Sequence, residues 1–78
     1  HEKRVIVRGE DPITEVPESL RMLKSEITAD GQLSVMFNPT EIKLADVLAR
    51  INVAGIVVAD LSTQEADLED VFLKLTSG

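Results

Sequence analysis

Apolar and polar residues alternate in two separate stretches, which predicts two strands that each bury one face. Residues 3–8 place Val5 and Val7 on one side of the first stretch. Residues 32–37 alternate in the same way, and Leu33, Val35 and Phe37 share one side. A period of two is typical of a half-buried strand. These five apolar residues are therefore predicted to form the core.

The dipeptide Asp30-Gly31 lies between residues 25–29 and the second alternating stretch. Asp-Gly between two strand-like runs is a strong hairpin signal, because both residues tolerate the backbone of a tight turn. We therefore expect strands at 25–29 and 32–37 that form an antiparallel hairpin.

Two segments have features of a helix. Pro17 followed by Glu18 favours a short first helix that carries Leu20 and Leu23. The run Asn38-Pro39-Thr40 offers a cap for a second, longer helix over residues 41–54, whose apolar residues follow a helical period. Gly55 stands where a left-handed C-terminal cap belongs.

The end of the chain predicts one more strand and one more helix. Residues 56–61 (Ile-Val-Val-Ala-Asp-Leu) read as a fourth strand. Ser62 and Glu65 then have the spacing of a capping box. An apolar stripe at i, i+3, i+4 and i+7 follows, which predicts a C-terminal amphipathic helix, and its members are Leu68, Val71, Phe72 and Leu75.

The predicted order β-α-β-β-α-β, with an added helix, is that of an α+β domain of the ferredoxin-like, split βαβ type. Its sheet would be four-stranded and antiparallel, with the first and third strands in the middle. The 78 residues are enough for one domain, which we assign to residues 1–78.

This arrangement leaves apolar side chains on the sheet face away from the helices. Ile6, Met36 and either Ile56 or Val58 would lie there. Exposed apolar patches on small domains usually mark contacts. The cover would be the C-terminal helix, a second copy of the chain, or the rest of a longer protein.

Charge and composition exclude several kinds of partner and site. Fourteen acidic residues against eight basic ones give a net charge of -6, which would repel a nucleic acid. The chain has no cysteine, and its longest apolar run is far shorter than the roughly 20 residues of a membrane helix. No signal peptide is recognisable.

Catalytic and cofactor motifs are missing from the sequence. His1 is the only histidine and stands at a terminus, so it gives no triad or metal cluster. No glycine-rich phosphate loop occurs. The acidic residues Asp67, Glu69 and Asp70 suit the first turn of a helix better than a calcium loop. We expect no catalysis, cofactor or metal in these 78 residues.

The closing residues 66–76, Ala-Asp-Leu-Glu-Asp-Val-Phe-Leu-Lys-Leu-Thr, resemble a known motif. The motif is similar to the end of the ATP-binding subunits of bacterial ABC transporters of the multidrug and antibiotic exporter type, where a small accessory domain follows the nucleotide-binding domain. Residues 7–9, 30–33 and 48–55 resemble the same domain. Ala66 departs from the pattern, because many relatives carry Pro or Ser there.

The resemblance implies a regulatory and interaction domain excised from a longer ABC ATPase, cytoplasmic and peripheral to the inner membrane. Its partners would be the nucleotide-binding domain of the same chain, a sister copy in a homodimer, and, through the parent, a membrane permease. ATP and Mg²⁺ would belong to the parent subunit. The expected contact residues are Ile6, Met36, Leu68, Glu69, Asp70, Val71, Phe72 and Leu75.

An alternative function of a different class is a small-molecule-sensing module of ferredoxin-like fold. Small antiparallel α+β domains host many unrelated functions, ligand binding among them. Such a module would need a polar group that points into a pocket, and the predicted inward faces offer none.

Overall fold

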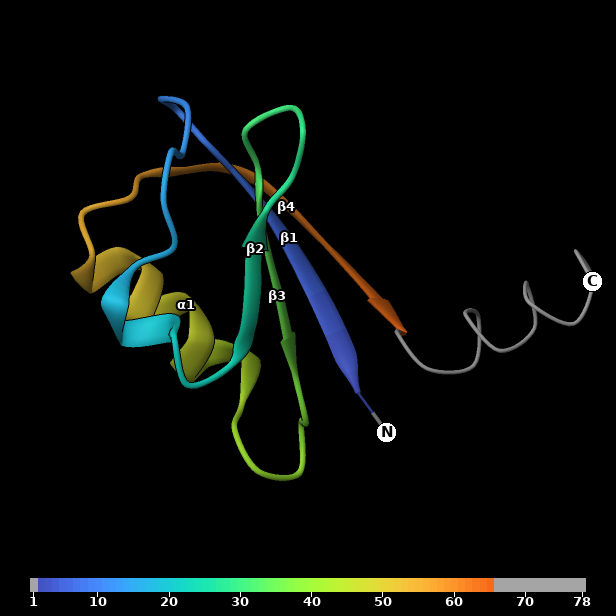
Figure 1. The fold of residues 1–78 in the computed structure, drawn as a ribbon. Helices are drawn as coiled ribbons and strands as arrows, with labels where there is room; N and C mark the ends of the chain where they lie inside the picture. Colours follow the sequence, from blue (N-terminus) through green and yellow to red (C-terminus); the bar gives the residue numbers. More distant parts are fainter. Residues whose placement is uncertain (1, 66–78) are drawn as a thin grey trace, which may run out of the picture.

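The computed structural model describes residues 2–65, which form a four-stranded antiparallel sheet with one α-helix on one face (Figure 1). The α+β class predicted from the sequence is confirmed at this level. The elements in chain order are β1 (Lys3–Gly9), a 3-10 turn η1 (Glu18–Leu20), β2 (Lys24–Ile27), β3 (Leu33–Phe37), α1 (Leu44–Val53) and β4 (Val58–Glu65).

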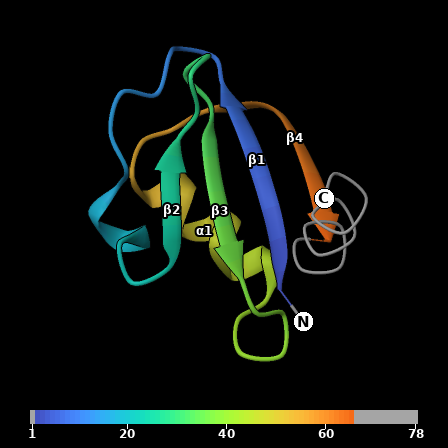
Figure 2. The ribbon, with the colours of Figure 1, turned by 45° about the vertical axis from the view of Figure 1, so that its right-hand side comes forward.

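The strands lie in the order β2-β3-β1-β4, so β1 and β3 are central and β2 and β4 are the edges. Val5 of β1 lies opposite Val35 of β3 on one side and opposite Thr63 of β4 on the other. Figure 2 shows α1 behind the sheet at β2 and β3, while β4 runs along the far edge, away from the helix.

The core lies between the sheet and α1. The five apolar residues predicted from the alternation of β1 and β3 are all buried, which confirms that prediction. Val47 and Ile51 of α1 and Leu20 of η1 complete the layer on the helix side. Ile13, from the loop after β1, is buried as well.

The predicted hairpin is confirmed, with a looser turn than a two-residue loop. The N–H of Gly31 donates to the carbonyl of Thr28 at 3.0 Å, and the N–H of Thr28 donates to the carbonyl of Gln32 at 2.7 Å. Gly31 has φ +80°, whereas none of the described non-glycine residues has a positive φ. This is the three-residue loop in which a type I turn precedes a left-handed glycine.

The first predicted helix is wrong. Only the turn η1 forms after Pro17, with the short i to i+3 bonds Leu20 N–H to Pro17 O at 3.0 Å and Arg21 N–H to Glu18 O at 3.2 Å. β2 begins at Lys24, so only six residues lie between Pro17 and the strand, and they form one short turn rather than a regular α-helix. Leu20 is nevertheless fully buried in the core, and Leu23 packs against it.

The second predicted helix is confirmed, but it begins at Leu44 rather than at residue 41. The Asn38 side chain accepts the Thr40 N–H at 2.9 Å, and its carbonyl accepts from Glu41 and Ile42, so these residues form a separate turn. At the other end of the helix, Gly55 has φ +86°, and its N–H donates to the carbonyl of Asn52. The N–H of Ile56 donates to the carbonyl of Ile51. This pair of bonds is the Schellman cap predicted for Gly55.

The fourth strand is longer than predicted and replaces the expected capping box. β4 covers Val58–Glu65, with Ser62 opposite Ile6 and Glu65 opposite Lys3. The prediction that Ser62 and Glu65 begin a helix is therefore wrong. A central strand needs a hydrogen-bonded neighbour on both sides, and pairing along the length of β1 outweighs the local preference for a cap.

The predicted C-terminal helix, together with the contact residues assigned to it, lies outside the described residues. These contact residues are Leu68, Glu69, Asp70, Val71, Phe72 and Leu75.

Candidate interaction surfaces

The sheet face turned away from α1 carries a small apolar centre within a polar surround. Ile6 of β1 and Met36 of β3 both lie there and are half-buried, as the sequence predicts for this pair. Ser34, directly opposite Ile6, is only 5% exposed. We call the face that carries these three residues the open face. Charged residues flank this centre on the neighbouring strands.

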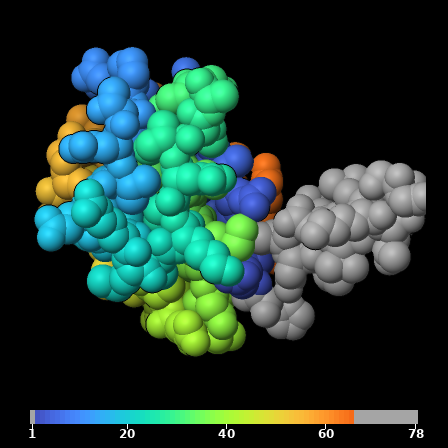
Figure 3. All heavy atoms as spheres, in the orientation of Figure 1, coloured from blue at the N-terminus to red at the C-terminus, as the bar shows by residue number. Residues whose placement is uncertain are grey.

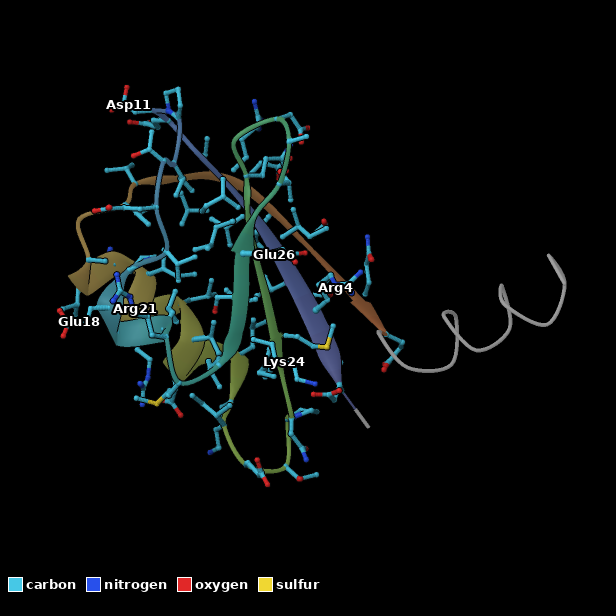
Figure 4. All side chains as sticks on the ribbon, in the orientation of Figure 1. Arg4, Asp11, Glu18, Arg21, Lys24 and Glu26 are labelled. Carbon is cyan, nitrogen blue, oxygen red and sulfur yellow. The ribbon has the colours of Figure 1, made fainter. Side chains whose placement is uncertain are left out.

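The charges on the open face differ from those of the chain as a whole. Arg4 and Lys24 both lie opposite Met36, from the strands on either side of it. With Glu26, they line a shallow hollow of about 260 Å³. Figure 4 shows Arg4 on the opposite side of the sheet from Asp11 and Glu18. In a chain of net charge -6, the open face thus carries three basic residues beside its apolar centre, Arg4, Arg8 and Lys24, together with two acidic ones, Glu26 and Asp60. The slight excess of positive charge suits an acidic, apolar partner surface.

One ion pair lies at the rim of this face. Arg8 Nη2 and Asp60 Oδ2 are 4.0 Å apart, and their side chains are 60% and 71% exposed. Ion pairs this exposed contribute little to stability. Arg8 and Asp60 therefore remain available to a partner at little cost.

The prediction that either Ile56 or Val58 is the third apolar residue of the open face is wrong for both residues. Ile56 precedes β4 and packs against the core. Val58 lies opposite Gly9, on the side of the sheet where Val7 is buried, and is 36% exposed. An irregularity in the pairing at Arg8 and Gly9 shifts this part of β4 by one residue, which reverses the faces expected from simple alternation.

A groove of about 530 Å³ separates the loop after β1 from the end of α1. Ile13 and Val57 contribute apolar surface, while Asp11, Glu15 and Glu18 contribute carboxylates. These three acidic residues are exposed, so they remain hydrated rather than pointing into a dry pocket. Sites for small molecules usually enclose most of the ligand. The groove thus gives little support to the sensing function considered above.

The space-filling view shows how the segment that lines this groove is placed. Residues 10–24, in blue to teal, cover much of the left part of the molecule in this orientation (Figure 3).

Within residues 2–65, no group of three or more acidic or histidine side chains is arranged to hold a metal ion. None of the helices described here is long and apolar enough to cross a membrane.

Sequence reasoning missed the outer edge of β4. All eight residues of this strand are exposed, although Leu61 and Thr63 lie in the row of the buried Val7 and Val5. The missed signal is that residues 61–65 contain Leu, Thr and no glycine or proline, which is compatible with a strand. The Ser-x-x-Glu spacing favoured a helix start at the same place.

Comparison with known proteins adds no relative to this picture. No protein family, no curated protein and no solved structure matches the chain.

Proposed function

We propose that this chain is an interaction and regulatory domain of an ATP-binding subunit of a bacterial ABC exporter. The observation that carries the proposal is the closing motif, in which acidic, apolar and aromatic residues follow one another in a fixed order from Asp67 to Leu75. The open face supports it, since it offers an apolar centre flanked by the cationic side chains of Arg4 and Lys24.

The fold fits this proposal as a reduced form of the split βαβ pattern. In that reading, η1 takes the place of the first helix and α1 is the second. The antiparallel order β2-β3-β1-β4, with β1 and β3 central, supports it. Because η1 is a single turn, less of the sheet is covered from within the domain than a full second helix would cover.

The proposed mechanism is contact rather than chemistry. The domain would be cytoplasmic, next to the membrane through the permease of its parent transporter, and the parent's own nucleotide-binding domain would bind ATP and Mg²⁺. The closing segment carries Asp67, Glu69 and Asp70 beside its apolar stripe. Such a segment is complementary to cationic surfaces like the open face, on a sister copy or on a related domain.

The open reading frame that encodes this chain tests the proposal. We expect the frame to encode a Walker A loop, an ABC signature sequence and Walker B carboxylates ahead of these 78 residues. The reason is that an accessory domain works only when it is tethered to the domain that it serves. Sequencing the complete frame checks this. A frame that holds no nucleotide-binding domain would contradict the proposal.

A further inference from the structure

The outer edge of β4 presents a row of backbone groups, one of which, the Leu61 N–H, donates to the side chain of its neighbour Asp60. No strand among residues 2–65 pairs with this edge, because β4 ends the sheet. An exposed strand edge is a template for another strand, since its N–H and C=O groups seek partners. At eight residues, β4 is twice as long as β2, the other edge of the sheet, with four residues.

Two hydrogen bonds show which residues face outward. The backbone N–H of Glu10, the residue after β1, donates to the carbonyl of Val57 at 2.9 Å. The backbone N–H and C=O groups of the even-numbered residues of β1 therefore point toward β4. The N–H of Leu61 donates to its neighbour Asp60 Oδ1 at 2.9 Å, which points it away from β1. The direction in which the backbone N–H and C=O groups point alternates from one residue of a strand to the next. The backbone groups that point away from β1 are therefore those of Leu61, Thr63 and Glu65.

The two edges of the sheet are protected to different degrees. Lys24 and Glu26 are exposed on the short β2, and charged side chains on a short strand hinder pairing with another chain. β4 has no lysine and no proline, its outward residues are Leu61, Thr63 and Glu65, and its other charged residue, Asp60, is paired with Arg8. Leu61 is also 38% exposed next to the fully buried Val7. A neighbouring strand would cover this apolar area.

We propose that the β4 edge pairs with the β4 edge of a second copy of this chain, giving one continuous eight-stranded antiparallel sheet. An antiparallel edge is complementary to itself, because a two-fold axis brings each outward N–H opposite an outward C=O. The axis passes through Thr63, and Leu61 lies opposite Glu65 of the partner subunit. This register uses all three outward residues and places no carboxylate opposite another. On pairing, the Leu61 N–H exchanges its bond to Asp60 Oδ1 for one to the backbone carbonyl of Glu65 of the partner subunit.

The proposal deepens the proposed function, because it names a second copy as one partner and the surface that binds it. Its physical argument nevertheless rests on β4 alone. A chain that dimerises through β4 but whose reading frame lacks a nucleotide-binding domain would overturn only the proposed function. A frame that encodes that domain, with a chain that does not pair through β4, would overturn only the edge pairing.

A single introduced cysteine tests the contact, since the chain has no cysteine of its own. In Thr63→Cys, the two thiols would be directly opposed across the axis. Opposed residues of a hydrogen-bonded pair have Cα atoms about 5.5 Å apart, within the range of a disulfide. We expect mild oxidation to give a covalent dimer, seen on a non-reducing gel. The matched control is Glu26→Cys on the β2 edge, which should stay monomeric. Equal cross-linking of the two variants would overturn the proposal.

Sedimentation equilibrium of the unmodified chain and of Thr63→Pro gives the second readout. The unmodified chain should rise from 8.5 kDa toward twice that mass with concentration. Proline removes an outward N–H that β1 does not use, so the dimer should be lost while circular dichroism stays unchanged. If Thr63→Pro unfolds, Thr63→Lys replaces it, because two opposed lysines repel each other. A folded variant that still dimerises, or an unmodified chain that stays monomeric throughout, would overturn the pairing.

Discussion

Phe37→Ala is expected to lower the free energy of unfolding by about 3–5 kcal/mol, the usual range for removing a buried phenylalanine. Phe37 is 2% exposed and is the largest of the buried side chains. It stands at the end of β3, opposite Lys3, and the chain has only one other phenylalanine. A domain of this size has roughly 4–12 kcal/mol of total stability. The variant should therefore be partly or wholly unfolded at room temperature, which urea titration followed by circular dichroism would measure.

Met36→Ala is the matched control for Phe37→Ala. Met36 is the preceding residue in the same strand, but it points to the open face and is half-buried. Its loss should cost about 1 kcal/mol, because little enclosed volume is emptied. Equal losses for the two variants would contradict the assignment of the two faces of β3.

Leu20→Ala is expected to cost about 2–5 kcal/mol, even though Leu20 lies in a single 3-10 turn. The side chain is fully buried, and its carbonyl accepts bonds from Leu23 N–H at 3.0 Å and from Ser25 Oγ at 3.0 Å. Leu20 belongs to the buried core cluster, so its removal would leave a cavity there. Thermal unfolding of the variant beside the unmodified chain measures the loss.

Met22→Ala separates burial from a general effect on this segment. Met22 is two residues later and 71% exposed. Its replacement should change the free energy of unfolding by less than about 0.5 kcal/mol, as is usual at exposed positions. If Leu20→Ala costs no more than Met22→Ala, then η1 does not hold the core.

The parts of the fold that could be predicted from sequence are those in which one local pattern has one structural solution. The alternation of β1 and β3 fixes which side chains are buried, because a shift of one residue would expose Val5 and Leu33. Gly31 and Gly55 were likewise predictable, since the turn and the cap both need a left-handed backbone.

The parts that could not be predicted depend on distant residues. The first helix is an exception with a local cause, because only residues 18–23 separate Pro17 from β2 and a single 3-10 turn forms there. The extension of β4 through Ser62 depends on its partner Ile6 in β1, which lies 56 residues earlier in the chain. The open face was predictable for Ile6 and Met36, whose strands alternate regularly. It was not predictable near Val58, where the register shifts.

The outer edge of β4 shows the same limit in the candidate site. Edges arise from strand order, and strand order is a property of the whole sheet. A pattern analysis that ends a strand at Leu61 cannot identify the outward groups of Thr63 and Glu65. The closing motif, in contrast, is a sequence feature and needed no structure.

Calorimetric titration of the 78-residue chain with the nucleotide-binding domain that we expect in the same reading frame tests the central claim most directly. We predict a one-to-one complex, weakened at least tenfold by Phe72→Ala, since an aromatic anchor usually contributes more than about 1.4 kcal/mol to such a contact. Lys74→Ala, outside the apolar stripe, should leave the affinity unchanged, and circular dichroism should show both variants folded. No binding of the unmodified chain, equal losses in both variants, or unfolding by Phe72→Ala would contradict the account.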